Sequence, residues 1–218
     1  MLFRSEREKI ALPVVDADAN RESNFLALGD SYTIGEGVPA SGRWPAQLAT
    51  RLGWAAPTIV AQTGWTTDEL ALAIDAAGLA SVYDRVSLLI GVNNQYRGRT
   101  VANYAAEFRV LLDRSVALAG GDAKRAFVVS IPDWGVTAFA ARDDRGRARI
   151  GREIDAFNAA ARAVSEARGV RYIDITPTSR DRGGDPAMLA DDGLHPSAAM
   201  YTRWVDDIVH TLPVAGPG

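Results

Sequence analysis

Five short runs of apolar residues recur along the chain, at positions 24–28, 58–61, 85–90, 126–131 and 170–175. Most of these runs are apolar at successive positions, a pattern typical of strands that are covered on both faces. The segments between them carry alanine, leucine, glutamate and arginine at helical spacing, at 44–52, 67–77, 101–119 and 150–168. Strands that alternate with helices in this way predict an α/β fold, a three-layer α/β/α domain on a parallel sheet of about five strands.

A last helix is predicted at 197–212, with Pro196 at its first helical position. Its apolar residues fall on one stripe, which we expect to pack on the sheet. The stripe consists of Met200, Tyr201, Trp204, Val205, Ile208 and Leu212. The pattern therefore divides the chain into an N-terminal extension (1–23), one domain (24–212) and a C-terminal tail (213–218).

Composition narrows the possible partners. The 218 residues are 47% hydrophobic and 23% charged, which suits one folded domain. A net charge of −3 argues against nucleic acid as a partner, and the arginine-containing run at 141–149 is interpreted as a solvated connection without a chemical role. The absence of cysteine excludes disulfides and thiolate metal sites.

No segment approaches the ~20 apolar residues that a membrane span requires. The first 23 residues contain only a six-residue apolar run, IALPVV, which is too short for the core of a secretory signal. We therefore expect no membrane span and a cytoplasmic location.

A candidate nucleophile lies at the end of the first apolar run, in the sequence Gly29-Asp30-Ser31. Such a turn after a strand serves either a phosphate-binding loop or a serine nucleophile, and taken alone it is more often an ordinary turn. The stretch DDGLHPS at 191–197 favours the nucleophile, because Asp192 precedes His195 by three residues, within one turn.

These residue types suit a catalytic triad. A serine hydroxyl needs a neutral imidazole to take its proton during attack, which assigns Ser31 and His195. Asp192 would hold the imidazole in the correct tautomer, and Asp191 would point elsewhere. His210 falls opposite the apolar stripe of the last helix and is expected to be a solvated surface residue.

Other residues after the predicted strands suit the remaining parts of such a site. The backbone N–H groups of Ser31 and Gly64 and the side-chain amide of Asn93 could bind the oxyanion of a tetrahedral intermediate. Gly64 could instead relieve a tight bend, and Asn93 could form an Asx turn. Trp65 and Trp134 lie where a pocket wall is expected, whereas Trp44 and Tyr96 are candidates for the core.

The blocks ALGDSYTIGEG, Gly64, Gly91 with Asn93, and DGLHP resemble, in order and spacing, the SGNH subgroup of the GDSL hydrolases. The resemblance spans residues 25 to about 205, with the first and last blocks the most specific. Tyr32 replaces the leucine of the family's GDSL string, and the third block reads GVNN where the family often has an acid after the asparagine.

The resemblance implies a flavodoxin-like sheet in the order 2-1-3-4-5 and the same three oxyanion donors. It implies a serine esterase that cleaves carboxylic esters, or thioesters, through an acyl-enzyme on Ser31. Because the triad supplies its own base and the two histidines lie apart, we expect no metal and no cofactor. The expected partner is a small-molecule ester, and the sequence makes no prediction of the oligomeric state.

Two alternatives to catalysis are a flavodoxin-like module that holds phosphate in the first turn and an inactive SGNH-like protein that only binds ligand. GDSYTIGEG lacks the Gly-Lys-Ser/Thr ending of a phosphate loop, and GEGVPASG lacks the G-x-G-x-x-G spacing. The intact triad favours the enzyme.

Overall fold

A parallel sheet of five strands forms the centre of the computed structural model, which describes residues 23–79 and 82–212. The strand order is β2-β1-β3-β4-β5, which confirms the predicted order. The strands are β1 (Phe25–Gly29), β2 (Thr58–Ala61), β3 (Arg85–Leu89), β4 (Ala126–Val129) and β5 (Arg171–Ile173). The predicted tail, and the predicted extension apart from residue 23, lie outside the described residues.

The central strands are buried on both faces, as their continuous apolar runs predict. Every residue of β1 and β4 is buried, whereas the edge strands β2 and β5 are partly exposed. The register pairs Gly29 with both Ala61 and Leu89, so β1, β2 and β3 end at the same level. Chain segments that follow these three strands therefore meet at one edge of the sheet.

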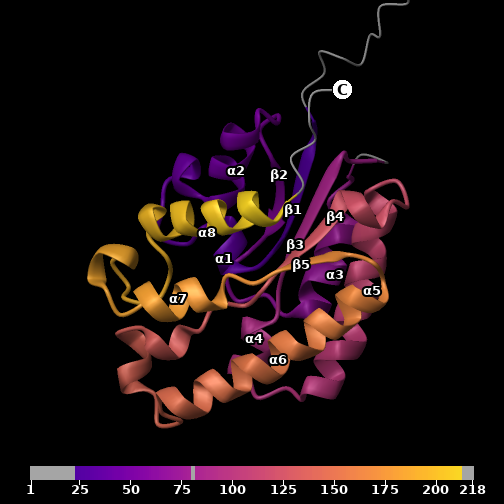
Figure 1. Cartoon of the computed structure of the whole chain (residues 1–218). Coiled ribbons are helices and arrows are strands. Elements are labelled where there is room, and N and C mark those ends of the chain that lie inside the picture. Colours follow the sequence, from indigo (N-terminus) through magenta and orange to yellow (C-terminus); the bar gives the residue numbers. More distant parts are fainter. Residues whose placement is uncertain (1–22, 80–81, 213–218) are drawn as a thin grey trace, which may run out of the picture.

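Helices cover both faces of the sheet (Figure 1). On one face α2 packs against α8, and on the other α5 packs against both α3 and α6. These long helices are α2 (Trp44–Leu52), α3 (Thr67–Ala76), α5 (Val101–Leu118), α6 (Arg147–Ala167) and α8 (Ala198–Thr211). None of the helices in the described residues is both long and apolar enough to cross a membrane.

The apolar stripe of α8 is buried as predicted, except that Leu212 ends the helix and is only partly buried. The predicted start of this helix was wrong. Pro196 precedes the helix, and Ser197 is the N-cap because its hydroxyl accepts the N–H of Met200 at 3.4 Å.

Several short helices connect the strands to the long helices and were not predicted, because they span too few residues to show a periodicity. The α-helices among them are α1 (Ser31–Ile34), α4 (Val92–Tyr96) and α7 (Thr176–Arg182). The 3-10 helices are η1 (Ala40–Gly42), η2 (Ala123–Arg125), η3 (Trp134–Val136), η4 (Phe139–Arg142) and η5 (Pro186–Met188).

Candidate active site

Ser31 lies where the central strand β1 ends and α1 begins. Asp30 is the N-cap residue of α1, and its side chain accepts the backbone N–H of Tyr32 at 3.0 Å. Glycine is required at position 29, because a Cβ atom there would overlap the side chain of Thr33. The turn therefore places Ser31, which is 4% exposed, at the carboxyl edge of the sheet.

The carboxyl group of Asp30 is fully buried beside the candidate nucleophile. Burial raises the pKa of Asp30 from 3.8 to about 7, although the backbone N–H groups of Tyr32 and Gly91 oppose the rise. Asp30 thus has the loop-fixing role that its position beside a glycine turn suggests.

His195 is held by one carboxylate. Its Nδ1 lies 2.6 Å from Oδ2 of Asp192, while Oδ1 of Asp192 accepts the backbone N–H groups of Leu194 and His195, each at 2.9 Å. Partial burial tends to raise the pKa of Asp192, but the hydrogen bonds from the His195 ring and the two backbone N–H groups together lower it. These hydrogen bonds therefore stabilise the ionised form of Asp192.

The neighbouring candidates lie elsewhere. Asp191 is exposed and makes no hydrogen bond or ion pair within the described part of the chain. His210 is exposed on α8, where its Nδ1 lies 2.7 Å from the carbonyl oxygen of Asp206. Neither residue is part of the candidate site.

Ser31 and His195 line the same pocket, which has a volume of about 210 Å³. Gly64, Asn93 and Trp134 line it as well, so segments far apart in sequence meet here. The hydroxyl of Ser31 makes no hydrogen bond to any residue that the structure describes, an arrangement common in ligand-free enzymes.

Two backbone N–H groups at this pocket have no protein acceptor. Among the described residues, neither the N–H of Ser31 nor that of Gly64 donates a hydrogen bond. Gly64 has a φ of +89°, a left-handed conformation that favours glycine. Both donors are therefore free to bind an oxygen atom in the pocket.

Helix α4 holds the loop that contains Gly64. Asn93 donates one of its two amide hydrogens to the carbonyl of Trp65 at 2.9 Å, and Arg97 donates to the carbonyl of Gly64 at 2.7 Å. Asn94 does not line the pocket; it is buried and donates to the hydroxyl of Thr67 at 2.7 Å. Asn93 thus lines the pocket with one amide hydrogen uncommitted, while Asn94 has a structural role.

Aromatic side chains form much of the remaining wall. Tyr32, Tyr96, Trp134 and Phe139 all line the pocket, and the ring of Trp134 lies 5.5 Å from that of Tyr96 and 6.1 Å from that of Phe139. Tyr96, considered a core candidate, is 48% exposed. It follows Asn93 by three residues in α4, which places both on one face, but α4 was not predicted.

Trp65 is not among the lining residues. Its side chain packs against the hydrophobic core, and it contributes to the site through its backbone carbonyl, which accepts from Asn93. Trp44 is fully buried in the core.

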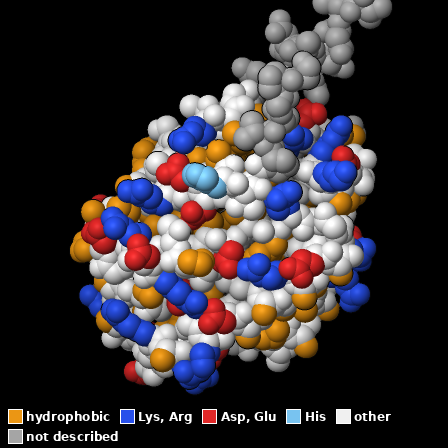
Figure 2. Space-filling model, in the orientation of Figure 1, with side chains coloured by type: hydrophobic (Ala, Val, Ile, Leu, Met, Phe, Trp, Pro, Cys, Tyr) orange, Lys and Arg blue, Asp and Glu red, His pale blue; other side chains and the backbone are white. Residues whose placement is uncertain are grey.

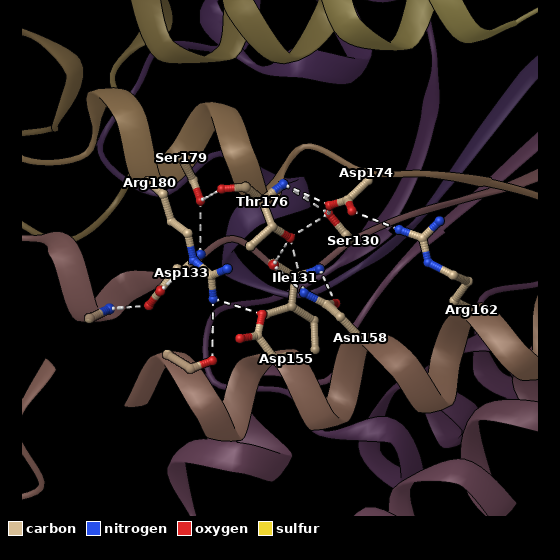
Figure 3. A network of polar contacts seen from close by, with 12 residues as sticks. Ser130, Ile131, Asp133, Asp155, Asn158, Arg162, Asp174, Thr176, Ser179 and Arg180 are labelled. Carbon is tan, nitrogen blue, oxygen red and sulfur yellow. Dashed lines mark hydrogen bonds and ion pairs between the residues drawn. The ribbon is translucent and has the colours of Figure 1, made fainter. Parts of the chain in front are cut away.

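A polar network fixes the segment that carries Trp134 (Figure 3). The carboxylate of Asp133 accepts hydrogen bonds from the backbone N–H of Gly135 at 2.8 Å and from Nε of Arg180 at 2.9 Å. Arg180 also pairs with Asp155 on α6 at 2.8 Å. The network ties η3 to α6 and α7, so the Trp134 side of the pocket is anchored to these two helices.

The strand order, the serine after β1 and the Asp–His pair before the last helix define an α/β protein with a candidate active site at the carboxyl edge of its sheet. The family model described as "GDSL-like Lipase/Acylhydrolase family" matches residues 27–203. The chain belongs to this family, and family and fold together support hydrolysis of esters.

Solved structures, among them two esterases, share the fold. TesA matches with a TM-score of 0.67 and 21% identity over 87% of this chain and 98% of that chain. The acetylxylan esterase Axe2 from Geobacillus stearothermophilus matches with a TM-score of 0.69 and 18% identity over 88% and 95%. The psychrotrophic esterase EstA from Pseudoalteromonas sp. matches with a TM-score of 0.66 and 17% identity over 87% and 96%. Curated protein sequences give no match.

Proposed function

We propose that the protein is a serine esterase in which Ser31 is the nucleophile, His195 the general base and acid, and Asp192 the residue that orients His195. One observation carries the proposal. Ser31, His195 and two N–H groups without a protein acceptor surround one pocket, and the second nitrogen of His195 lies 2.6 Å from the Asp192 carboxylate.

In the first half of the reaction, Oγ of Ser31 attacks the ester carbonyl carbon while Nε2 of His195 takes the hydroxyl proton. The tetrahedral intermediate then collapses, the bond to the leaving oxygen breaks, and His195 donates the proton to that oxygen. The alcohol departs and the acyl group remains on Ser31. A thioester would follow the same steps with a thiol as the product.

In the second half, water attacks the acyl-enzyme and gives its proton to His195. Collapse of the second intermediate releases the carboxylic acid and returns the proton to Ser31. One ester and one water thus become one acid and one alcohol. Asp192 stabilises the imidazolium in both halves without taking its proton.

The negative oxygen of each intermediate would be bound by three donors, the N–H groups of Ser31 and Gly64 and the free amide hydrogen of Asn93. Each such donor typically contributes about 3 kcal/mol to catalysis. The hydrogen bonds from Asn93 and Arg97 to the Gly64 loop support this assignment, because they hold the donors in place before substrate binds.

The pocket volume favours a short acyl group. About 210 Å³ is below the ~300–1,000 Å³ usual for drug-sized ligands, and aromatic rings close the wall around it. We therefore propose acetyl to butyryl esters as the preferred class.

The rival interpretation is a protein that binds ligand without catalysis. A fluorophosphonate probe distinguishes the two, and the similar esterase EstA is described as inhibited by a phosphonate. We expect covalent labelling of wild type at Ser31, no labelling of Ser31→Ala, and hydrolysis of short 4-nitrophenyl esters by wild type alone. An unlabelled wild-type protein without esterase activity would reject the proposed function.

A further inference from the structure

A second pocket adjoins the candidate active site, and arginine side chains form much of its lining. Its volume is about 540 Å³, compared with about 210 Å³ for the first pocket. The arginines are Arg99, Arg145, Arg149 and Arg152, and Glu153 is the one acidic residue among the described residues that line it. The esterase chemistry makes no use of this pocket.

The side chains of Tyr96 and Trp134 separate the two pockets. The guanidinium of Arg145 lies 4.9 Å from the ring centre of Tyr96 and 5.0 Å from that of Trp134, and both rings line the first pocket. Gln95, which lines the second pocket, accepts the indole N–H of Trp134 at 2.9 Å. Tyr96 and Trp134 thus stand between the two pockets, and Tyr96 is 48% exposed.

Two of the arginines are held in place by acids outside the pocket lining. Arg99 pairs with Asp68 at 2.7 Å and with Glu107 at 3.5 Å, and Arg145 pairs with Asp143 at 2.7 Å. A carboxylate occupies at most two or three of the five N–H donors of a guanidinium, so further donors remain. These ion pairs reduce the local charge, but they also fix the arginines before a ligand arrives.

The other two arginines lie on the first turns of α6. Arg149 pairs with Glu153 at 2.7 Å, whereas Arg152 is exposed and has no ion-pair partner in the part of the chain that the structure describes. The first turn of α6 carries no acidic residue and no side-chain cap, so its N-terminus adds positive potential. Figure 2 shows several basic side chains over the region where Figure 1 places the start of α6, with acidic ones among them.

We propose that this pocket binds an anionic group, phosphate or carboxylate, on the leaving-group side of the ester, while the acyl group occupies the smaller aromatic pocket. The proposal rests on the proposed esterase function. An apolar acyl group suits the aromatic pocket, and guanidinium groups bind phosphate and carboxylate by paired hydrogen bonds. The preferred substrate is then a short-chain ester of an alcohol or thiol that bears a negative charge, with Arg152 as its main partner.

The test uses acetate esters of straight-chain alcohols of increasing length. The far end of each alcohol is a free hydroxyl, a phosphate or a carboxylate. We expect kcat/KM for an anionic ester to exceed that of the matched hydroxyl ester by about tenfold at one chain length, through a lower KM, as one charge-assisted hydrogen bond would produce. The phosphate and carboxylate arms show which anion is preferred. Equal kcat/KM values for all three ends at every length would overturn the proposal.

Arg152→Gln provides the matched variant. It should reduce the ratio of anionic to hydroxyl ester kcat/KM to about one, and added salt should reduce the wild-type ratio in the same direction. Arg109→Gln is the control, because Arg109 is also exposed, lies on α5 outside both pockets and makes no ion pair within the described residues. A ratio that falls equally in both variants would contradict a specific site.

Binding of inorganic pyrophosphate, measured by calorimetry, separates this proposal from the esterase proposal. Binding by wild type and Arg109→Gln but not by Arg152→Gln supports the anion pocket even if no ester is hydrolysed. Hydrolysis of the hydroxyl esters without any preference for anionic ones, and without pyrophosphate binding, would leave the esterase intact and reject the anion pocket.

Discussion

Nδ1 of His195 lies 2.6 Å from one oxygen of Asp192, and the other oxygen accepts the backbone N–H of His195 at 2.9 Å. One carboxylate thus holds both the ring and the backbone of the histidine, although the Asp192 side chain is 42% exposed. The three-residue spacing makes this double contact possible, because both groups lie within one turn of chain. The short loop between Ala190 and His195 is itself closed by the hydrogen bond from the Ala190 N–H to the His195 carbonyl at 2.7 Å.

Asp192→Asn should reduce kcat by up to ~10⁴, the scale observed when a triad loses its orienting carboxylate, while the protein stays folded. Asp191→Asn is the matched control and should change kcat little, since Asp191 is exposed and does not line the pocket. Steady-state kinetics with a short 4-nitrophenyl ester and circular dichroism test both. A larger loss in Asp191→Asn than in Asp192→Asn would show that the orienting residue is misassigned.

His195→Ala should nearly abolish turnover, whereas His210→Ala on the exposed face of α8 should leave it close to wild type. The difference is expected because His195 lines the pocket with Ser31 and contacts the Asp192 carboxylate, whereas His210 does neither. Steady-state kinetics with a short 4-nitrophenyl ester measure both variants. Turnover that depends on His210 instead would contradict the assignment.

Asn93→Ala should lower kcat by about 10²–10³ with a small change in KM, the effect of removing one oxyanion donor. Asn94→Ala tests the neighbouring amide, which contacts Thr67 rather than the pocket. This variant should have a lower melting temperature than wild type. Its kcat, measured at a temperature where the variant is folded, should fall less than the kcat of Asn93→Ala. Similar kcat losses in both folded variants would indicate that Asn93 acts only by supporting the loop.

Phe139→Ala should enlarge the pocket beside Ser31 and shift the preferred ester toward longer acyl chains. Phe139 lines the pocket and is only partly buried, so its removal opens space without breaking the Trp134 to Gln95 hydrogen bond. The measurement is kcat/KM for 4-nitrophenyl esters of rising chain length. Leu72→Ala is the control, because Leu72 is an exposed residue of α3 outside the pocket. An unchanged chain-length profile in Phe139→Ala would place the acyl group elsewhere.

The raised pKa of Asp30 predicts that the free energy of unfolding depends on pH. Burial raises its pKa from 3.8 to about 7, so between these values the folded protein keeps the proton that the unfolded chain has lost. The free energy of unfolding therefore falls as pH rises through this window and levels off above it, a loss on the order of 4 kcal/mol. Asp30→Asn, which keeps an N-cap acceptor, should lack this loss.

Urea unfolding of wild type and Asp30→Asn across this pH range tests the prediction. The stability of the variant relative to wild type should increase from about pH 4 to about pH 7. A difference that stays constant with pH would contradict a protonated, buried Asp30.

The sequence by itself predicted the sheet and the principal blocks of the site. Continuous apolar runs determine which strands are central, because only residues covered on both faces need to be apolar at every position. The residues in GDSY and DGLHP are local signals, since a turn after a strand and a three-residue Asp–His spacing are readable within a few positions. The strand order, in contrast, came from the family resemblance and not from the periodicity.

Only the tertiary structure decided how the pocket is closed. Tyr96 and Asn93 share a face of α4, a helix of five residues, which is too short to show a periodicity in sequence. Trp65 was expected in the pocket wall, but its side chain packs on the core. The position of Trp65 in the sequence places it in the loop after β2, whereas the backbone conformation of that loop sets the direction of the ring.

The arginine-containing run at 141–149 is a second example of a contact that the sequence alone did not predict. In sequence it is a charged connection, and most of its residues are indeed exposed. The folded chain brings the guanidinium of Arg145 to within 5.0 Å of the ring centres of both Tyr96, which follows β3, and Trp134, which follows β4. Contacts of this kind depend on strand order and register. The charged residues identified 141–149 as a solvated segment. Which of these residues lies beside the pocket was decided by packing between segments that are far apart in sequence.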